Sequence, residues 1–346
     1  MYIISHAEHL FKNIYSHALK ITPFRATLWY NVGMFLEILL KILSIFLLTG
    51  IGYAAYKIRL VPQDALRTLN AYVLNIAVPC LVLQSMQRNE INDRVFNDIV
   101  WSLAAFAIVT LVLSGIAILV LRSIKSIPEE DKGIYEMQIA FTNCGFMGYP
   151  LTTVLFGKYA LFLAIIMNIV FTTAVYSVGV VMLLHKKGEK LFTMKLMVRM
   201  LSLPFVASIA GLIIFITGFH FPLFIDDTLS LVAATVSPVA MFIVGINLSN
   251  SKIREIMSPR NLVLCAVSLI AVPALTLGID LLLPVSNLVL VIHVFLMAMP
   301  SAAITTVLCH RYNKNAKLAA EGVASTTFFS LGTLALWTFF LTELFL

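Results

Sequence analysis

Two breaks in apolar segments contain the residues best suited to hold a small anion. The first is the run Asn143-Cys144-Gly145-Phe146-Met147-Gly148-Tyr149-Pro150, inside an apolar stretch of roughly residues 134–157. The second is Met297-Ala298-Met299-Pro300-Ser301, in a matching position of the other half of the chain. Glycine and proline interrupt a helix, and a helix that restarts after the break presents free backbone N–H groups with a partial positive charge. Such a helix start can bind a carboxylate.

The predicted substrate-binding residues follow these two breaks. We expect new half-helices to begin near Pro150 and near Pro300, because proline is favoured at the first position of a helix. Asn143 adds a side-chain amide that both donates and accepts hydrogen bonds. The predicted set is Asn143, Gly148, Pro150, Leu151, Pro300, Ser301 and Ala302. The alternative interpretation of the breaks is a structural kink or close helix packing through glycine.

Three ionisable residues are candidates for binding a coupling proton or cation. Glu136 lies in the first turns of the segment that contains the first break, and Glu321 opens the last apolar segment. His293 lies seven residues before Pro300, and histidine changes its charge near neutral pH. A carboxylate at a helix start can instead complement the helix dipole, and the histidine can be a hydrogen-bonded core residue. Both interpretations stay open for each residue.

The remaining charges in apolar segments have simpler interpretations. Glu37 and Lys41 are four positions apart, so we expect them to pair on one helix face near the outer boundary of the membrane. Asp280 lies near the end of its segment, and we expect it at the membrane interface.

Signatures of catalysis and of metal binding are absent from the sequence. It contains no HExxH, GxSxG or P-loop motif and no tight cluster of histidine, cysteine and carboxylate residues. The four cysteines lie in or at the ends of hydrophobic segments without a CxxC pair, and we expect them to be small buried residues: Cys80, Cys144, Cys265 and Cys309. We therefore expect no enzyme, no metal and no cofactor.

The composition predicts an all-α membrane protein. Of the 346 residues, 60% are apolar and 12% are charged, and the mean hydropathy is +0.96. The apolar runs are continuous rather than alternating, which excludes a transmembrane β-barrel. We attribute the net charge of +7 to basic cytoplasmic loops rather than to nucleic-acid binding.

Ten transmembrane spans are predicted from the apolar windows. Their approximate limits are 34–57, 65–86, 97–121, 133–157, 159–184, 199–217, 227–249, 261–283, 287–310 and 317–342. The longest polar connection, residues 185–190, separates two sets of five. The expected organisation is an N-terminal extension with a peripheral amphipathic helix (1–33), a first five-helix repeat (34–185) and a second (186–346).

The distribution of positive charge predicts the orientation. Of 24 Lys and Arg residues, 17 fall on one side of the ten predicted spans and six on the other. The positive-inside rule then places both termini outside the cytoplasm.

Five spans per half give the two halves opposite orientations, as in an inverted repeat. Prolines support this arrangement, because Pro238 in span 7 lies 159 positions after Pro79 in span 2 and Pro300 lies 150 positions after Pro150. The breaks in spans 4 and 9 should then meet near the membrane midplane and cradle one carboxylate.

These motifs resemble the auxin efflux carrier family over roughly residues 35–346. The first crossover of that family reads Asn, several residues, then Met-Gly-x-Pro-Leu, and here it stands as Asn143 followed by Met147-Gly148-Tyr149-Pro150-Leu151. Supporting matches are Ala77-Val78-Pro79, Ala240-Met241-Phe242, Met299-Pro300 and Arg311-Tyr312-Asn313.

The resemblance implies a ten-helix inverted-repeat fold related to the bile-acid sodium symporters. Spans 1, 2, 6 and 7 would form a scaffold, and the other six a mobile domain with crossing broken helices. Asn143 and the two prolines carry over as site residues. Plant members have Gln where this chain has Ser301, and a long central loop where this chain has about 15 residues. The chain resembles the compact bacterial branch more, which implies a bacterial inner membrane.

The expected function is secondary active transport of small organic anions, auxin-like or malate- and malonate-like carboxylates, by elevator-type alternating access. Expected partners are the substrate, the lipid bilayer, H⁺ or Na⁺ and a second copy of the chain. One alternative is a sodium-coupled symporter of the bile-acid type, with Glu136 and Glu321 as ligands. The other is a membrane receptor that uses the same pocket without transport.

Overall fold

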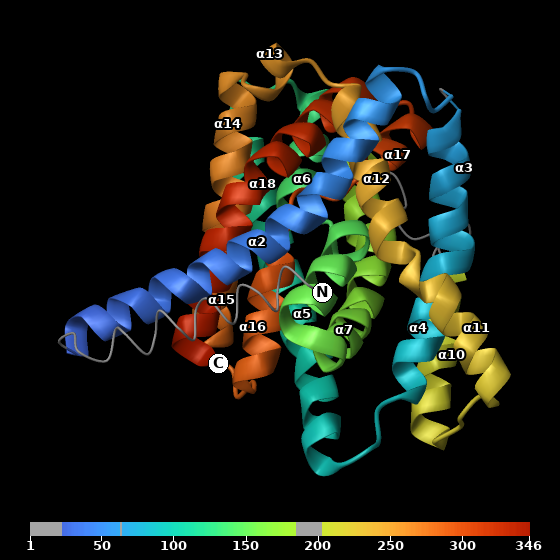
Figure 1. The fold of residues 1–346 in the computed structure, drawn as a ribbon. Helices are drawn as coiled ribbons and strands as arrows, with labels where there is room; N and C mark the ends of the chain where they lie inside the picture. The colour runs from blue at the N-terminus through green and yellow to red at the C-terminus, as the bar shows by residue number, and fades with distance from the viewer. Residues whose placement is uncertain (1–22, 63, 185–202) are drawn as a thin grey trace.

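The computed structural model describes residues 23–62, 64–184 and 203–346. Within these ranges the chain is helical, and the only β-type pairing is an isolated bridge (Figure 1). The all-α prediction is thereby confirmed. Most of the predicted N-terminal extension and of the connection between the two predicted halves lie outside the described residues.

The first part of the chain, up to residue 184, forms helices in the following order. They are α2 (Pro23–Lys57), α3 (Ala65–Tyr72), η1 (Val73–Ala77), α4 (Val78–Gln87), α5 (Asp93–Ser123), α6 (Glu129–Ala140), η2 (Cys144–Gly148), α7 (Tyr149–Ala174), η3 (Val175–Gly179) and α8 (Val180–Leu184).

The second part, from residue 203, forms another series of helices. They are α10 (Leu203–Thr217), α11 (Leu223–Ala234), α12 (Val236–Ser249), α13 (Ile253–Ile256), α14 (Pro259–Ala266), η4 (Val267–Ala271), α15 (Val272–Asp280), α16 (Asn287–Met297), α17 (Ile304–Arg311) and α18 (Ala316–Phe345).

Seven helical stretches among the described residues are long and apolar enough to cross a membrane. They are 33–57, 65–87, 93–123, 144–184, 223–249, 259–280 and 316–345, and two shorter apolar helices, 203–217 and 287–297, accompany them. The sequence predicts ten spans, and the stretch 144–184 is one place where the two counts differ, because it contains the boundary between predicted spans 4 and 5. At this boundary Gly157 adopts φ 86° and ψ −171°. Only glycine adopts this conformation readily, so the helix direction changes there.

Three prolines in these stretches follow a π-helical turn rather than a complete break. The turns η1, η2 and η4 end two residues before Pro79, Pro150 and Pro273, respectively. Proline lacks an N–H and its ring clashes with the carbonyl one turn back. A wider turn accommodates both problems, and such π-turns occur frequently at functional sites.

The helices pack in two groups (Figure 1). One contains α2, α3, α4, α10, α11 and α12, and its central contact is between α2 and α12. Gly52 on α2 lies against the backbone of Phe242, and Gly245 on α12 lies against the backbone of Thr49, so a Cβ at either glycine would collide with the partner helix. Small residues allow membrane helices to approach this closely.

The second group contains both sequence breaks. In it α5 packs on α6 and α7, α16 packs on α15, α7 and α18, and α18 also contacts α14 and α17. The side chains of Asn92, Ser286 and Asn315 cap α5, α16 and α18, each by accepting a hydrogen bond from a first-turn backbone N–H. The start of each of these helices is thus set locally.

Candidate functional site

The two sequence breaks contact each other through their backbones. Thr142 and Ser301 form an isolated antiparallel bridge. Beside it, the N–H of Asn143 donates to the carbonyl oxygen of Pro300 (2.7 Å), and the N–H of Ala302 donates to that of Phe141 (2.9 Å). In an apolar environment each unpaired backbone group would cost several kcal/mol, roughly 2–7 by transfer data. Each break therefore supplies partners for the other.

The helices restart at other residues than predicted from the prolines. The first restarts at Cys144, six residues before Pro150, and the second at Ile304, four residues after Pro300. The N–H of Gly148 donates to the carbonyl of Asn143 (3.0 Å), so the π-turn η2 already forms helix before the proline. Pro150 then occupies the beginning of α7 inside a continuous helical stretch. The expected half-helix start at Pro150 is wrong for this reason.

Asn143 lies at the end of the crossing with hydrogen-bonding capacity to spare. Its residue is 6% exposed, and its side-chain amide has no hydrogen-bond partner among the described residues. The backbone N–H groups of Gly145 and Phe146, in the first turn after it, likewise have no acceptor in the described part of the chain. A Cβ built on Gly145 meets no atom within 4 Å. Donors and free space thus occur together at the start of this helix.

Ser301 lies in the crossing, but its polar groups are already engaged. Its hydroxyl donates to the carbonyl of Gln138 (2.8 Å), and its N–H donates to the hydroxyl of Thr326 (3.1 Å). The residue is 0% exposed. These bonds join the second break to α6 and α18, so the serine holds the crossing together.

Three predicted site residues lie on the packed side of the first restarted helix. Gly148 faces Leu296, whose Cδ2 would lie 2.9 Å from an added Cβ. Pro150 and Leu151 are buried in α7, Leu151 within an apolar cluster. The structure brings Asn143 together with Pro300, Ser301 and Ala302. It places Gly148, Pro150 and Leu151 one to two turns into the helix that restarts at Cys144.

The predicted coupling carboxylates both form ion pairs. Glu136 is 0% exposed and accepts from Nε of Arg122 at 3.1 Å through one oxygen; its other oxygen has no partner among the described residues. Glu321 contacts Arg260 at 3.0 Å and Lys317 at 3.7 Å. Both carboxylates are therefore held by cations, Glu136 in the second half of α6 and Glu321 in the second turn of α18.

His293 contacts a carboxylate that we expected at the membrane interface. Nδ1 of His293 lies 2.8 Å and 3.1 Å from the two oxygens of Asp280. Asp280 is 1% exposed and is therefore buried within the protein; its expected depth at the membrane interface stays a prediction. Asp280 ends α15 and faces α16, which packs on it and excludes solvent.

Asp98 is a buried carboxylate that sequence reasoning missed. It is 1% exposed and accepts hydrogen bonds from the hydroxyls of Tyr159 (2.8 Å) and Ser286 (2.7 Å). It lies one residue inside predicted span 3, where a boundary uncertain by a few residues hides it. The rule that an ionisable residue at membrane depth is a functional candidate would have found it.

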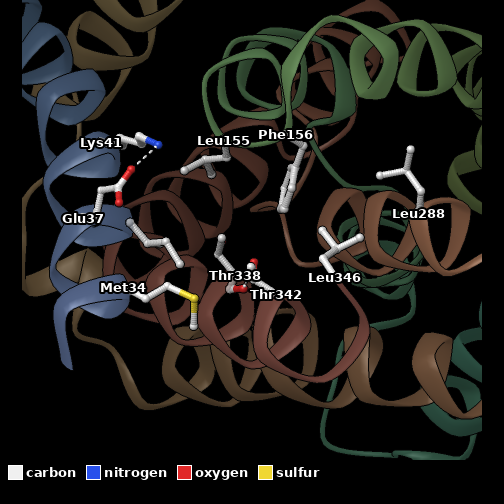
Figure 2. A pocket seen from close by; sticks show the side chains of 10 residues that line it. Met34, Glu37, Lys41, Leu155, Phe156, Leu288, Thr338, Thr342 and Leu346 are labelled. Carbon is white, nitrogen blue, oxygen red and sulfur yellow. Dashed lines mark hydrogen bonds and ion pairs between the residues drawn. The ribbon is translucent and has the colours of Figure 1, made fainter. Parts of the chain in front are cut away.

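A separate cavity of about 310 Å³ lies between α2, α7, α16 and α18 (Figure 2). Glu37 and Lys41 line it and form the predicted ion pair, with 2.7 Å between Oε1 and Nζ. Its other lining residues are mostly apolar, among them Leu155 and Phe156. None of the crossing residues lines this cavity. Among the cysteines, Cys144, Cys265 and Cys309 are buried and Cys80 is half-buried, and all four are free.

Comparison with known proteins assigns the chain to a family. Residues 37–338 match the family model described as "Membrane transport protein". The chain belongs to this family. The match confirms the resemblance to auxin efflux carriers, and it covers both sequence breaks and every predicted site and coupling residue.

Two archaeal relatives align with most of this chain. One is an "Uncharacterized transporter" of Methanothermobacter thermautotrophicus, 26% identical over 298 residues, which are 86% of this chain and 96% of the relative. The other, of Methanocaldococcus jannaschii, carries the same description and is 25% identical over 300 residues, again 86% and 96% of the two chains. The chain is thus a multi-pass membrane protein of a transporter family.

Proposed function

We propose that the protein is a secondary active transporter of small organic anions and that the crossing of the two breaks binds the substrate. The observation that carries the proposal is the group of free donors at the start of the Cys144 helix. The amide of Asn143 and the N–H groups of Gly145 and Phe146 have no partner among the described residues, and Gly145 borders free space. In a membrane transport family, such a group at membrane depth is suited to a substrate rather than to packing.

The chemistry of these donors favours a carboxylate. Backbone N–H groups at a helix start carry partial positive charge, and an asparagine amide adds a neutral donor. Neutral donors avoid the large cost of a buried lysine or arginine in the apolar part of the membrane. The proposed substrates are mono- or dicarboxylates, either auxin-like or malate- and malonate-like. Pro300, Ser301 and Ala302 position this site from the opposite break.

We further propose ten spans in two inverted five-helix repeats. The turn at Gly157 supports a division of residues 144–184 into two spans, and the breaks support spans composed of α6 with η2 and of α16 with α17. Equivalent positions of the two proposed repeats are separated by similar numbers of residues. The helix α16 begins 158 positions after α6, and Ser301 lies 159 positions after its bridge partner Thr142. Such regularity favours repeats of about 34–185 and 186–346.

Two helix groups suggest how the substrate moves. The group centred on α2 and α12 is the proposed scaffold. The group with α5 to α8 and α14 to α18 carries the crossing and would move as a unit in an elevator-type cycle. The excess of Lys and Arg on one side supports termini outside the cytoplasm.

The decisive experiment measures carboxylate binding and uptake by the full-length protein. Purified protein is screened by thermal shift against a panel that includes malonate, malate and indole-3-acetate, because a ligand of the folded state raises its apparent stability. The same compounds are then tested for uptake into proteoliposomes, with and without sodium. We expect a carboxylate to stabilise the protein and to be transported.

The variant Asn143→Ala tests the proposed site. We expect it to reduce binding at least about tenfold, which is about 1.4 kcal/mol, with little change in thermal stability because the amide makes no hydrogen bond with the described residues. Asn168→Ala is the matched control, since Asn168 lies in neither break and its amide contacts Thr172 (3.5 Å) within α7. Unchanged uptake by Asn143→Ala would refute the site. Binding without uptake would favour a receptor, and strict sodium dependence a sodium symporter.

A further inference from the structure

A histidine–aspartate pair lies fully buried between α15 and α16. The side chains of His293 and Asp280 are both 0% exposed, and Nδ1 lies 2.8 Å from the nearer carboxylate oxygen. A carboxylate only accepts hydrogen bonds when ionised, so Nδ1 carries the hydrogen in this contact. The second ring nitrogen, Nε2, has no hydrogen-bond partner among the described residues.

This arrangement has one vacant proton-binding atom. With Nδ1–H donated to Asp280, the lone pair of Nε2 is free, and the pair as a whole carries one negative charge. A proton that binds Nε2 converts the ring to imidazolium and makes the pair neutral. A net charge in an apolar interior is costly, whereas a neutral hydrogen-bonded ion pair costs less. Proton binding and release therefore change the electrostatic cost of burying this part of α16.

A pair with permanent charge occupies the corresponding place in the first half of the chain. Asp280 lies 158 positions after Arg122, and His293 lies 157 positions after Glu136, close to the spacing between α6 and α16. Arg122 and Glu136 form the partly buried ion pair described above. Arginine does not release its proton in proteins. The two halves thus contain equivalent pairs, of which only the histidine pair can readily change its charge.

Other titratable groups lie on the helices that surround the pair. The elements packed on α16 are α5, α7, α15, α18 and η2. Besides Asp280 they carry titratable groups in or near the membrane, namely Asp93, Arg94, Asp98 and Arg122 on α5, Tyr149, Lys158 and Tyr159 on α7, Cys144 on η2 and Lys317, Glu321 and Glu343 on α18. The face of the imidazole is covered by Phe106, with 5.1 Å between ring centroids.

Among these groups, Asp98 is the only other buried carboxylate on the same end of α16. Both its oxygens already accept hydrogen bonds, from Tyr159 and from Ser286 at the start of α16. Glu321 pairs with Arg260 at the start of α14. Asp280 lies at the opposite end of the continuous helical segment formed by α14, η4 and α15 (Figure 1). Both carboxylates therefore have partners of their own, separate from the Asp280–His293 pair.

We propose that the Asp280–His293 pair is the proton-binding site of this transporter, with Nε2 of His293 as the atom that takes up and releases the coupled proton. In the loaded form the pair is imidazolium and carboxylate; in the unloaded form the imidazole is neutral and Nδ1 still donates to Asp280. The role in coupling rests on the proposed transport function. The binding of a proton at Nε2 does not.

Proton binding can be tested without any substrate. The full-length protein is labelled with ¹⁵N-histidine, and the ring nitrogens are followed by NMR between about pH 5 and about pH 9. We expect one signal, absent from His293→Gln, whose Nε2 gains a proton within this range and whose midpoint moves in Asp280→Asn. A His293 signal that keeps one protonation state throughout would overturn the proposal; should His293→Gln not fold, the signal is identified by its change in Asp280→Asn.

Coupling is tested in proteoliposomes that contain a pH-sensitive dye. Malonate, or whichever carboxylate of the thermal-shift panel stabilises the protein, is supplied as a gradient. We expect proton influx with the wild type and with His310→Gln, a control on the exposed last turn of α17. We expect His293→Gln to keep the thermal shift and to lose at least about nine-tenths of the proton influx. Full proton influx in His293→Gln would overturn the proposal and leave the transport function intact, whereas failure of transport in the wild type would leave the NMR result to stand alone.

Discussion

The backbone N–H of Asn143 donates a hydrogen bond to the carbonyl oxygen of Pro300 at 2.7 Å, across 157 positions of the chain. Together with the bond from Ala302 to Phe141, it joins the two breaks into one structural unit. Each break would be unfavourable at membrane depth without the other. The crossing is therefore stable because it pairs backbone groups, and it leaves the donors of the next turn free.

Gly145 and Gly148 are three residues apart and should respond differently to substitution. A methyl group on Gly145 would enter the free space beside the first-turn N–H groups, so we expect Gly145→Ala to lower carboxylate affinity at least about tenfold with a stability change of roughly 1 kcal/mol or less. Gly148→Ala would press on Leu296 and should cost about 1–3 kcal/mol by overpacking. Ligand titration and unfolding of both variants check this. Equal effects of the two variants on affinity would contradict it.

Ser301→Ala should affect stability more than binding. The change leaves the carbonyl of Gln138 without the 2.8 Å bond from Ser301. Loss of a buried hydrogen bond costs about 1–3 kcal/mol, which thermal unfolding would record as a lower midpoint. We expect the carboxylate dissociation constant to stay within about twofold of wild type. Ser123→Ala, at an exposed serine that bonds the carbonyl of Leu119, is the control. A tenfold loss of affinity at unchanged stability would show that the hydroxyl of Ser301 contacts the ligand.

Substitution of Arg122 should lower the stability of the protein more than substitution of Glu136. The side chain of Arg122 is 28% exposed and that of Glu136 is 0% exposed. Arg122→Met leaves a buried carboxylate unpaired and should cost about 3 kcal/mol. Glu136→Gln leaves a cation that reaches water, so its cost should be about 1 kcal/mol after allowance for solvent screening. Chemical unfolding of both single variants and of the double variant measures the difference.

The double variant separates pairing from other effects. We expect Arg122→Met with Glu136→Gln to be more stable than Arg122→Met alone, because no buried charge remains unpaired. A double variant as unstable as the sum of the two single changes would mean that the pair contributes nothing. In that case the contacts of Arg122 along its alkyl chain would account for its effect.

The sequence by itself determined the class of protein, its family and the location of the two breaks. Continuous apolar runs can only be membrane helices, and the effects of proline and glycine on the backbone are local, so their positions could be predicted without a structure. The pairing of Glu37 with Lys41 was predictable for the same reason, since it depends on one helical turn.

Only the tertiary structure decided which groups at the breaks are free. The helix restarts at Cys144 instead of Pro150 because a π-turn accommodates the proline, a choice that depends on what packs around it. Ser301 is engaged because Gln138 and Thr326 lie beside it, and Asp280 is buried because α16 covers the end of α15. These contacts join residues 13 to 163 positions apart. Local sequence patterns do not encode the distance between such residues in space, so the free amide of Asn143 and the Asp280–His293 pair could be recognised only in the folded chain.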